Sequence, residues 1–173
     1  MLLQDGRAAD QAVMEQFERL AISPDLPNRA AEAADMLLVL AHALQGVRDR
    51  VLAERFVAIG RHLSIPAAME LLIERAMSGH VDTSWVAPAL RFGGVPAVSL
   101  SLRRLGKTSE TGPRRVLSSL AHQLAGYPEL REPIVTALQI AFRDGTWTQS
   151  QDALALLTAL GEAPVSTSEA AAS

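Results

Sequence analysis

The sequence predicts an all-α fold, and three observations lead to that prediction. Alanine and leucine account for 29 and 25 of the 173 residues, and these two residues have the highest helix propensities. Aromatic residues make up only 4% of the chain, and the β-branched residues that favour strands are also scarce. Apolar residues recur with helical spacing along nearly the whole chain, between short Gly, Pro and Ser breaks. We therefore expect about eight or nine short helices.

The N-terminal half contains four predicted helices. Apolar residues at helical spacing predict the first over 13–20, and the proline-containing run 23–27 ends it. The segment 28–45 is apolar nearly all round, so we expect it to lie centrally with neighbours on several sides. The next two helices each carry one apolar stripe, formed by Leu52, Phe56, Ile59 and Leu63 and by Met69, Leu72, Ile73, Ala76 and Met77.

The same spacing of apolar residues predicts five helices in the C-terminal half. Two short helices are predicted over 82–91 and 95–105. Apolar residues alternate with serine at 98–102, which is also typical of a strand, but a lone strand without a pairing partner is unstable. Three later stripes predict helices over 116–124 and 134–142 and a last one that a capping-box pattern opens at 148–151. We expect residues 1–162 to form a single all-helical domain and 163–173 to be a disordered tail.

Charge, cysteine content and hydropathy exclude several protein classes. The net charge of −3 and the isoelectric point near 5.8 disfavour a general nucleic-acid binder. The chain has no cysteine, which excludes disulfides and thiolate metal sites and suits the cytoplasm. No signal peptide is visible at the N-terminus. The longest apolar run, 33–44, is well short of the ~20 residues of a membrane span. We expect a cytoplasmic protein with no membrane span.

Four helix ends suggest an internal repeat. Leucine-rich helices end near Leu44, Leu90, Leu124 and Leu160, at intervals of 46, 34 and 36 residues. The stretch 127–138 combines a proline turn, an arginine and then small and aliphatic residues. Residues 82–160 thereby resemble HEAT-like α-helical repeat proteins, which implies a stack of helix pairs. A compact irregular helical bundle is the alternative, since it obeys the same packing rules.

A basic cluster is the most distinctive local feature. It lies in the segment 103–115, which carries a net charge of +4 while the rest of the chain carries −7. We interpret the segment as a flexible polar loop that could bind an anion, a nucleic acid or an acidic partner. The alternative is a solvated loop, which the absence of interleaved aromatic residues favours. The candidate residues are Arg103, Arg104, Lys107, Arg114 and Arg115.

Four aromatic residues fall at predicted helix starts, ends or turns. They are Trp85, Phe92, Tyr127 and Trp147. In a stack of helices such positions lie along the edges, where aromatic anchors dominate protein interfaces. We predict that they bind a protein partner. The alternative is that they fill gaps between helices.

No pattern of catalytic residues is present. The sequence lacks the HExxH and GxSxG motifs, and Asp35, His42 and Ser118 would need a deep shared pocket to act together. We therefore expect no catalytic residues, no metal site and no cofactor. The predicted function is that of a non-enzymatic protein–protein interaction module, an adaptor or scaffold with a protein partner or a second copy of itself. The alternative is a regulatory module that binds nucleic acid or phosphate through 103–115.

Overall fold

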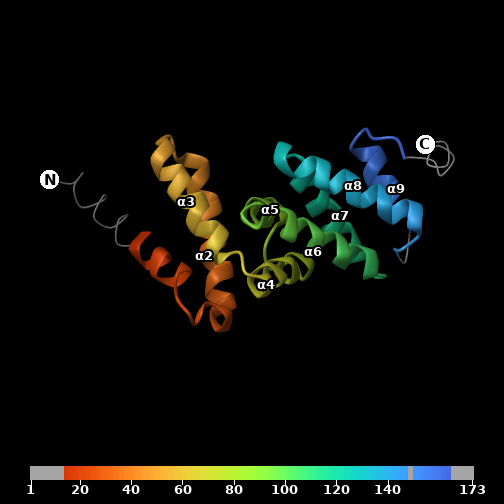
Figure 1. Ribbon diagram of the computed structural model, residues 1–173. Coiled ribbons are helices and arrows are strands. Elements are labelled where there is room, and N and C mark those ends of the chain that lie inside the picture. Colours follow the sequence, from red (N-terminus) through yellow and green to blue (C-terminus); the bar gives the residue numbers. More distant parts are fainter. Residues whose placement is uncertain (1–13, 148–149, 165–173) are drawn as a thin grey trace.

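Helices account for the regular structure of the described residues. The computed structural model describes residues 14–147 and 150–164 (Figure 1). A helical segment covers 14–21 and a 3₁₀ turn, η1, covers Leu26–Arg29. The α-helices are α2 (Ala30–Gly46), α3 (Arg50–Leu63), α4 (Pro66–Met77), α5 (Thr83–Arg91), α6 (Gly94–Lys107), α7 (Thr111–Ala125), α8 (Pro128–Asp144) and α9 (Ser150–Ala159).

The all-α prediction is confirmed, because these described ranges contain no strand. The alternating residues 98–102 lie inside α6, where Val98 and Leu102 are one helical turn apart and both buried. Residues 148–149 of the predicted capping box and 165–173 of the predicted tail lie outside the described residues.

Local capping explains where several helices begin and end. The Asp49 carboxylate accepts hydrogen bonds from the backbone N–H groups of Val51 (2.8 Å) and Leu52 (3.1 Å), which starts α3. Asp82 accepts from Ser84 N–H at 2.8 Å and starts α5. Pro128 occupies the first position of α8, where no N–H is needed. Gly145, in the left-handed region with φ of 59°, ends the same helix.

The interpretation of 103–115 as a loop is wrong. Helix α6 continues to Lys107 and α7 begins at Thr111, so only 108–110 link them. Gly106 lies in the last turn of α6, where a Cβ would come within 2.6 Å of the Trp147 ring. Pro113 is the third residue of α7, a position whose N–H has no partner within a helix. Glycine and proline here mark close packing and a helix start rather than a loop.

The helices form two series in which each helix contacts the next one. Helices α2, α5, α7 and α9 each contact the next in that order, and so do α4, α6 and α8. Sequential neighbours also pair, as α4 with α5, α6 with α7 and α8 with α9. Helix α2 contacts η1, α3, α4 and α5, which confirms the expected neighbours on several sides. The predicted helix ends Leu44, Leu90, Leu124 and Leu160 fall at or next to the ends of α2, α5, α7 and α9.

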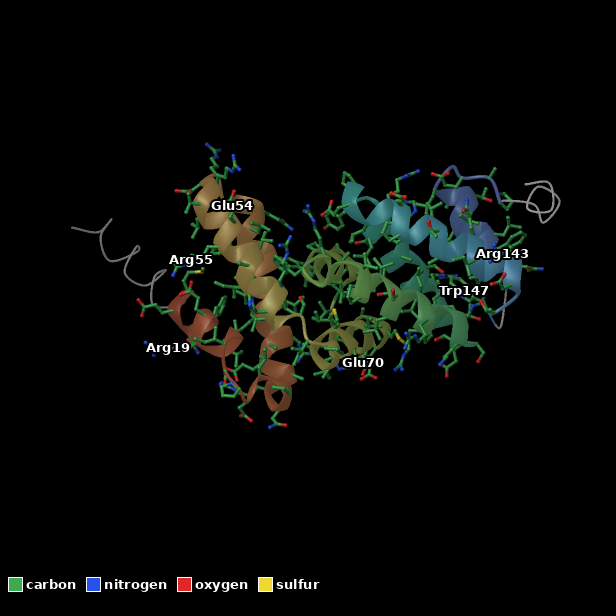
Figure 2. All side chains as sticks on the ribbon, in the orientation of Figure 1. Arg19, Glu54, Arg55, Glu70, Arg143 and Trp147 are labelled. Atoms are coloured by element: carbon green, nitrogen blue, oxygen red, sulfur yellow. The ribbon has the colours of Figure 1, made fainter. Side chains whose placement is uncertain are left out.

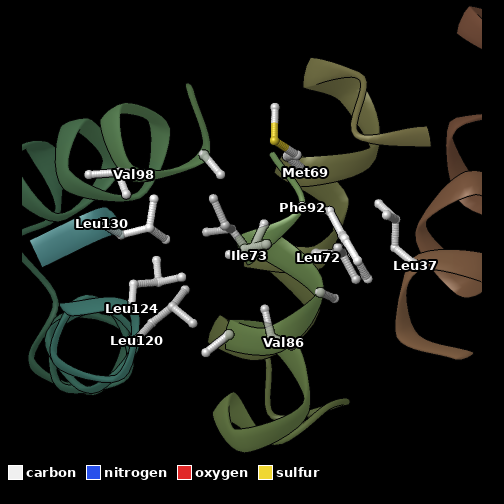
Figure 3. Packing of buried hydrophobic residues seen from close by; sticks show 14 of the residues in the cluster. Leu37, Met69, Leu72, Ile73, Val86, Phe92, Val98, Leu120, Leu124 and Leu130 are labelled. Carbon is white, nitrogen blue, oxygen red and sulfur yellow. The ribbon is translucent and has the colours of Figure 1, made fainter. Parts of the chain in front are cut away.

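The buried apolar residues form one cluster that runs from Met14 to Leu160. Leucine and isoleucine supply most of its largest fully buried side chains, and Figure 3 shows the part between α2 and α7. The one buried polar residue among the described positions is Ser101, whose hydroxyl donates to the Ala97 carbonyl at 2.9 Å. The hydroxyl therefore has a partner, which removes most of the free-energy cost of its burial.

Helix α3 stands at one end of the molecule and packs chiefly on α2 (Figure 1). The Arg55 guanidinium donates to both carboxylate oxygens of Glu18, at 2.5 and 2.8 Å, and so ties α3 to the segment 14–21. Helices α3 and α4 meet at 93°. Within the described ranges, no single helix combines the length and apolarity needed to cross a membrane, and α3 and α4 reach them only as this bent pair.

Candidate functional site

The ends of α2 and α5 and the start of α8 meet α3 at a groove of about 420 Å³. Ala41 and Leu44 of α2 and Val57 of α3 form one apolar wall. The opposite wall consists of Pro88 of α5, Tyr127 of the turn between α7 and α8, and Leu130 of α8. We call this the α3 groove. Its volume and mainly apolar lining are typical of binding sites in proteins.

Phe92 forms the floor of the α3 groove and fixes the position of α3. Its ring is only 8% exposed and lies among the core side chains of Figure 3. A Cβ added to Gly60 would lie 2.5 Å from two atoms of that ring, so the ring packs directly on the backbone of α3. The predicted partner-binding residue Phe92 thus lines the groove with little exposed surface and packs against α3.

Three residues form a charged and aromatic cluster at one side of the groove. The Arg91 Nε donates to Glu129 Oε1 at 2.6 Å, and the Arg91 guanidinium lies 4.5 Å from the centroid of the Tyr127 ring. A hydrogen bond from its own backbone N–H holds the pKa of Glu129 below its usual value, with a further lowering by Arg91. Burial raises the pKa of Tyr127. Near neutral pH, Glu129 is therefore ionised and paired, and Tyr127 is uncharged.

Arg61 is the remaining charged residue of the groove. Its side chain is exposed and has no ion-pair partner among the residues that the structure describes. A second, more open hollow shares Val57 and Arg61 with the groove and continues along α3 past Ala53. The other two charges of that hollow, Arg50 and Glu54, pair at 2.8 Å. Arg61 therefore gives this continuous surface one unpaired positive charge.

The other two predicted aromatic residues lie elsewhere. Trp85 is 46% exposed, and its ring centroid lies 4.8 Å from that of His42 in a tilted arrangement. It borders a separate shallow hollow with Leu38 and Val81. Trp147 packs on Gly106, at the opposite end of the molecule from α3 (Figure 2). Of the four predicted partner-binding residues, the fold brings only Phe92 and Tyr127 together.

The predicted basic cluster is smaller than its sequence suggests, because two of its arginines form ion pairs with other helices. The Arg104 Nη2 lies 2.9 Å from Glu74 Oε1, which links α6 to α4. Arg114 donates two hydrogen bonds to Asp152, at 2.5 and 2.9 Å, which link α7 to α9. Within this cluster, the cations without an ion-pair partner among the described residues are Arg103, Lys107 and Arg115, all of which are exposed.

The residues weighed for catalysis do not meet in the groove. Asp35 is exposed and accepts a hydrogen bond from Arg75 at 2.5 Å. His42 packs on Trp85, and neither Asp35, His42 nor Ser118 lines the groove. Over 14–147 and 150–164, no group of three or more His, Cys, Asp or Glu residues is placed to hold a metal ion.

Several groove residues were not singled out from the sequence, above all Val57 and Arg61 of α3 and Glu129 of α8. The helix end at Leu44 was visible in the sequence, but its meeting with α3, the end of α5 and the start of α8 depends on tertiary packing. The chain matches no protein-family model, no curated protein sequence and no solved structure. The geometry of the α3 groove therefore carries the functional interpretation.

Proposed function

We propose that this chain is a non-enzymatic protein–protein interaction module, an adaptor or scaffold whose α3 groove binds a segment of a partner protein. The observation that carries the proposal is the convergence of three helix ends and α3 on one mainly apolar groove. A floor of Phe92, apolar walls and a few polar groups at the rim are the usual composition of an interface core. Tyr127 beside Arg91 supplies the two residue types most often found at binding hot spots, together with tryptophan.

The succession of helix contacts supports the further proposal that 82–160 is a HEAT-like stack. In such a stack each helix pair contacts its neighbours, and the edges present helix ends and turns to a partner. Helices α5, α7 and α9 contact in order, and so do α6 and α8. The α3 groove lies at the edge where α5 and α7 end and α8 begins.

The proposal is tested by placing a charge in the groove. We expect Val57→Asp, at a half-buried groove position, to abolish capture of the partner from cells that express the protein. The matched control is Ile140→Asp, on α8 outside the groove and 45% exposed. The purified partner should then bind the wild type and Ile140→Asp with equal affinity in calorimetry, and Val57→Asp at least tenfold more weakly. Equal binding by a correctly folded Val57→Asp would refute the groove as the site.

A second copy of the chain is the competing occupant. Multi-angle light scattering across a concentration series distinguishes the two cases. A mass that rises from 18.5 kDa towards twice that value in the wild type, and stays at 18.5 kDa in Val57→Asp, would identify self-association through the groove.

A further inference from the structure

We infer that the occupant of the α3 groove is an amphipathic partner helix that places a carboxylate against Arg61. This inference rests on the proposed function and specifies the chemistry of the partner. Two features of the surface lead to it: the α3 side offers no free backbone groups, and Arg61 has no ion-pair partner among the residues that the structure describes.

The walls favour a helix over an extended segment. Along its length the surface is bounded by α3, whose backbone groups are bonded within the helix and are capped by Asp49 at its start and by the Ser64 N–H at its end. An extended segment would bury its own N–H and C=O groups without partners, which costs free energy. A helix bonds these groups internally and presents only side chains, as in other helix-in-groove complexes.

The length of the surface fits the same partner. The groove and the adjoining hollow follow one face of α3 from Arg50 to Arg61. Eleven residues of rise correspond to about 16 Å, or three helical turns. The apolar positions Ala53, Val57 and Leu44 lie along this surface, so a partner helix with apolar residues three and four positions apart would contact them.

The charge of the surface favours an acidic partner. Arg91 is neutralised by Glu129 and Arg50 by Glu54, which leaves Arg61 as the uncompensated charge. Arg61 belongs both to the groove and to the hollow, so a helix bound along this surface would pass beside it. A carboxylate there would form a charge-assisted hydrogen bond, and a lysine at the same point would be repelled.

The test is a selection from a phage-displayed library of fully randomised peptides of about 15 residues, a length that allows about four helical turns but does not impose a helix. Clones that also bind Val57→Asp are discarded, so that only groove-dependent binders remain. We expect the retained clones to share an apolar stripe and an Asp or Glu at one fixed position beside it.

The best selected peptide is then synthesised and its affinity measured by fluorescence anisotropy. We expect Arg61→Gln to weaken binding about twofold to fivefold, and the same loss when the acidic residue of the peptide is changed to its amide. Making both changes should cost no more than either alone. Arg61→Glu should instead prefer a peptide with lysine at that position. Arg115→Gln, an exposed arginine outside the groove, should bind as the wild type does.

The possible results separate the two proposals. Groove-dependent clones without a shared acidic position, bound equally well by Arg61→Glu, would overturn the acidic partner and leave the interaction module standing. Selection of extended, proline-rich clones would overturn the helical partner. A library that yields no groove-dependent binder at all would count against the proposed function itself.

Discussion

Gly60 determines how closely α3 approaches the rest of the molecule. We expect Gly60→Ala to reduce the free energy of unfolding by about 1–3 kcal/mol, because the new Cβ would lie 2.5 Å from the Phe92 ring and must displace it or α3. This cost exceeds the gain in helix propensity that alanine brings. Urea denaturation measures the change.

Gly112→Ala is the matched control for this change. Gly112 also lies in a helix, the first turn of α7, but a Cβ there would have no heavy atom within 4 Å. It should leave stability unchanged or raise it by up to about 1 kcal/mol. If both variants were equally stable, the contact between Phe92 and α3 would not be as tight as the structure has it.

Asp82 makes the stability of α5 depend on pH. Hydrogen bonds from the Ser84 side chain and backbone N–H lower the pKa of this carboxyl below 3.8. The folded state therefore favours the ionised carboxylate. The Asp82 cap stabilises the fold fully above the pKa that Asp82 has in the unfolded chain, and this stabilisation is lost as the pH falls through the lower pKa of the folded state. Below about pH 5, we expect the wild type to lose free energy of unfolding relative to Asp82→Asn.

Asparagine is the appropriate comparison because it also caps helices but does not titrate. The carboxyls of Glu18, Glu129 and Asp144 likewise have lowered pKa values and titrate in the same acid range. They are common to both proteins, so urea denaturation of the pair at each pH isolates Asp82. A difference that stays constant down to about pH 2 would contradict the assigned cap.

At the scale of elements, the Arg114–Asp152 pair joins α7 to α9. Both side chains are about one-fifth exposed, 19% and 20%, and the contact is bidentate. We expect Arg114→Met, which keeps the apolar stem, to cost about 1–2 kcal/mol, between the values for surface and buried pairs. Arg115→Met is the control and should change stability by less than about 0.5 kcal/mol, since that side chain is exposed. Thermal unfolding of both variants tests this, and equal melting temperatures would show that the pair contributes nothing.

The same segment shows what the sequence could and could not predict. The helices themselves were predictable, because their apolar stripes and their punctuation by Gly, Pro and Asp are local properties. The prediction of a loop over 103–115 was wrong because it rested on the polar and basic character of the segment and left Gly106 and Pro113 out of account. Gly106 packs against Trp147, which is distant in the sequence. Pro113 lies in the first turn of α7, a position that tolerates proline. The pairing of Arg114 with a residue 38 positions away was equally invisible.

The α3 groove could not be predicted for a related reason. Its residues come from helix ends that are separated by about 40 residues along the chain, such as Leu44, Pro88 and Leu130. Periodicity identifies which face of a helix is buried, but not which helix ends meet. Tyr127 and Phe92 were singled out because aromatic residues at helix ends suggest an edge, and Arg61 was not, because an arginine on a polar helix face is ordinary.

At the scale of the whole molecule, the contact pattern predicts uneven local stability. Helix α7 contacts α4, α5, α6, α8 and α9, whereas α3 packs chiefly on α2. Local opening costs least where few buried contacts are broken. We expect the amides of α3 to exchange with solvent at a lower free energy than those of α7, as measured by native-state hydrogen exchange. Uniform protection at the free energy of global unfolding would show instead that α3 opens only with the entire chain.

This gradient connects stability with the proposed function. Because α3 forms one wall of the α3 groove, a bound helix would add contacts to the element that opens most readily. We therefore expect the selected peptide to slow exchange in α3, around Val57, far more than in α9, which does not line the groove. Gly60→Ala, which loosens the seat of α3 on Phe92, should speed exchange in α3 without peptide and weaken binding in parallel. Binding that protected α9 as strongly as α3 would place the peptide elsewhere on the molecule.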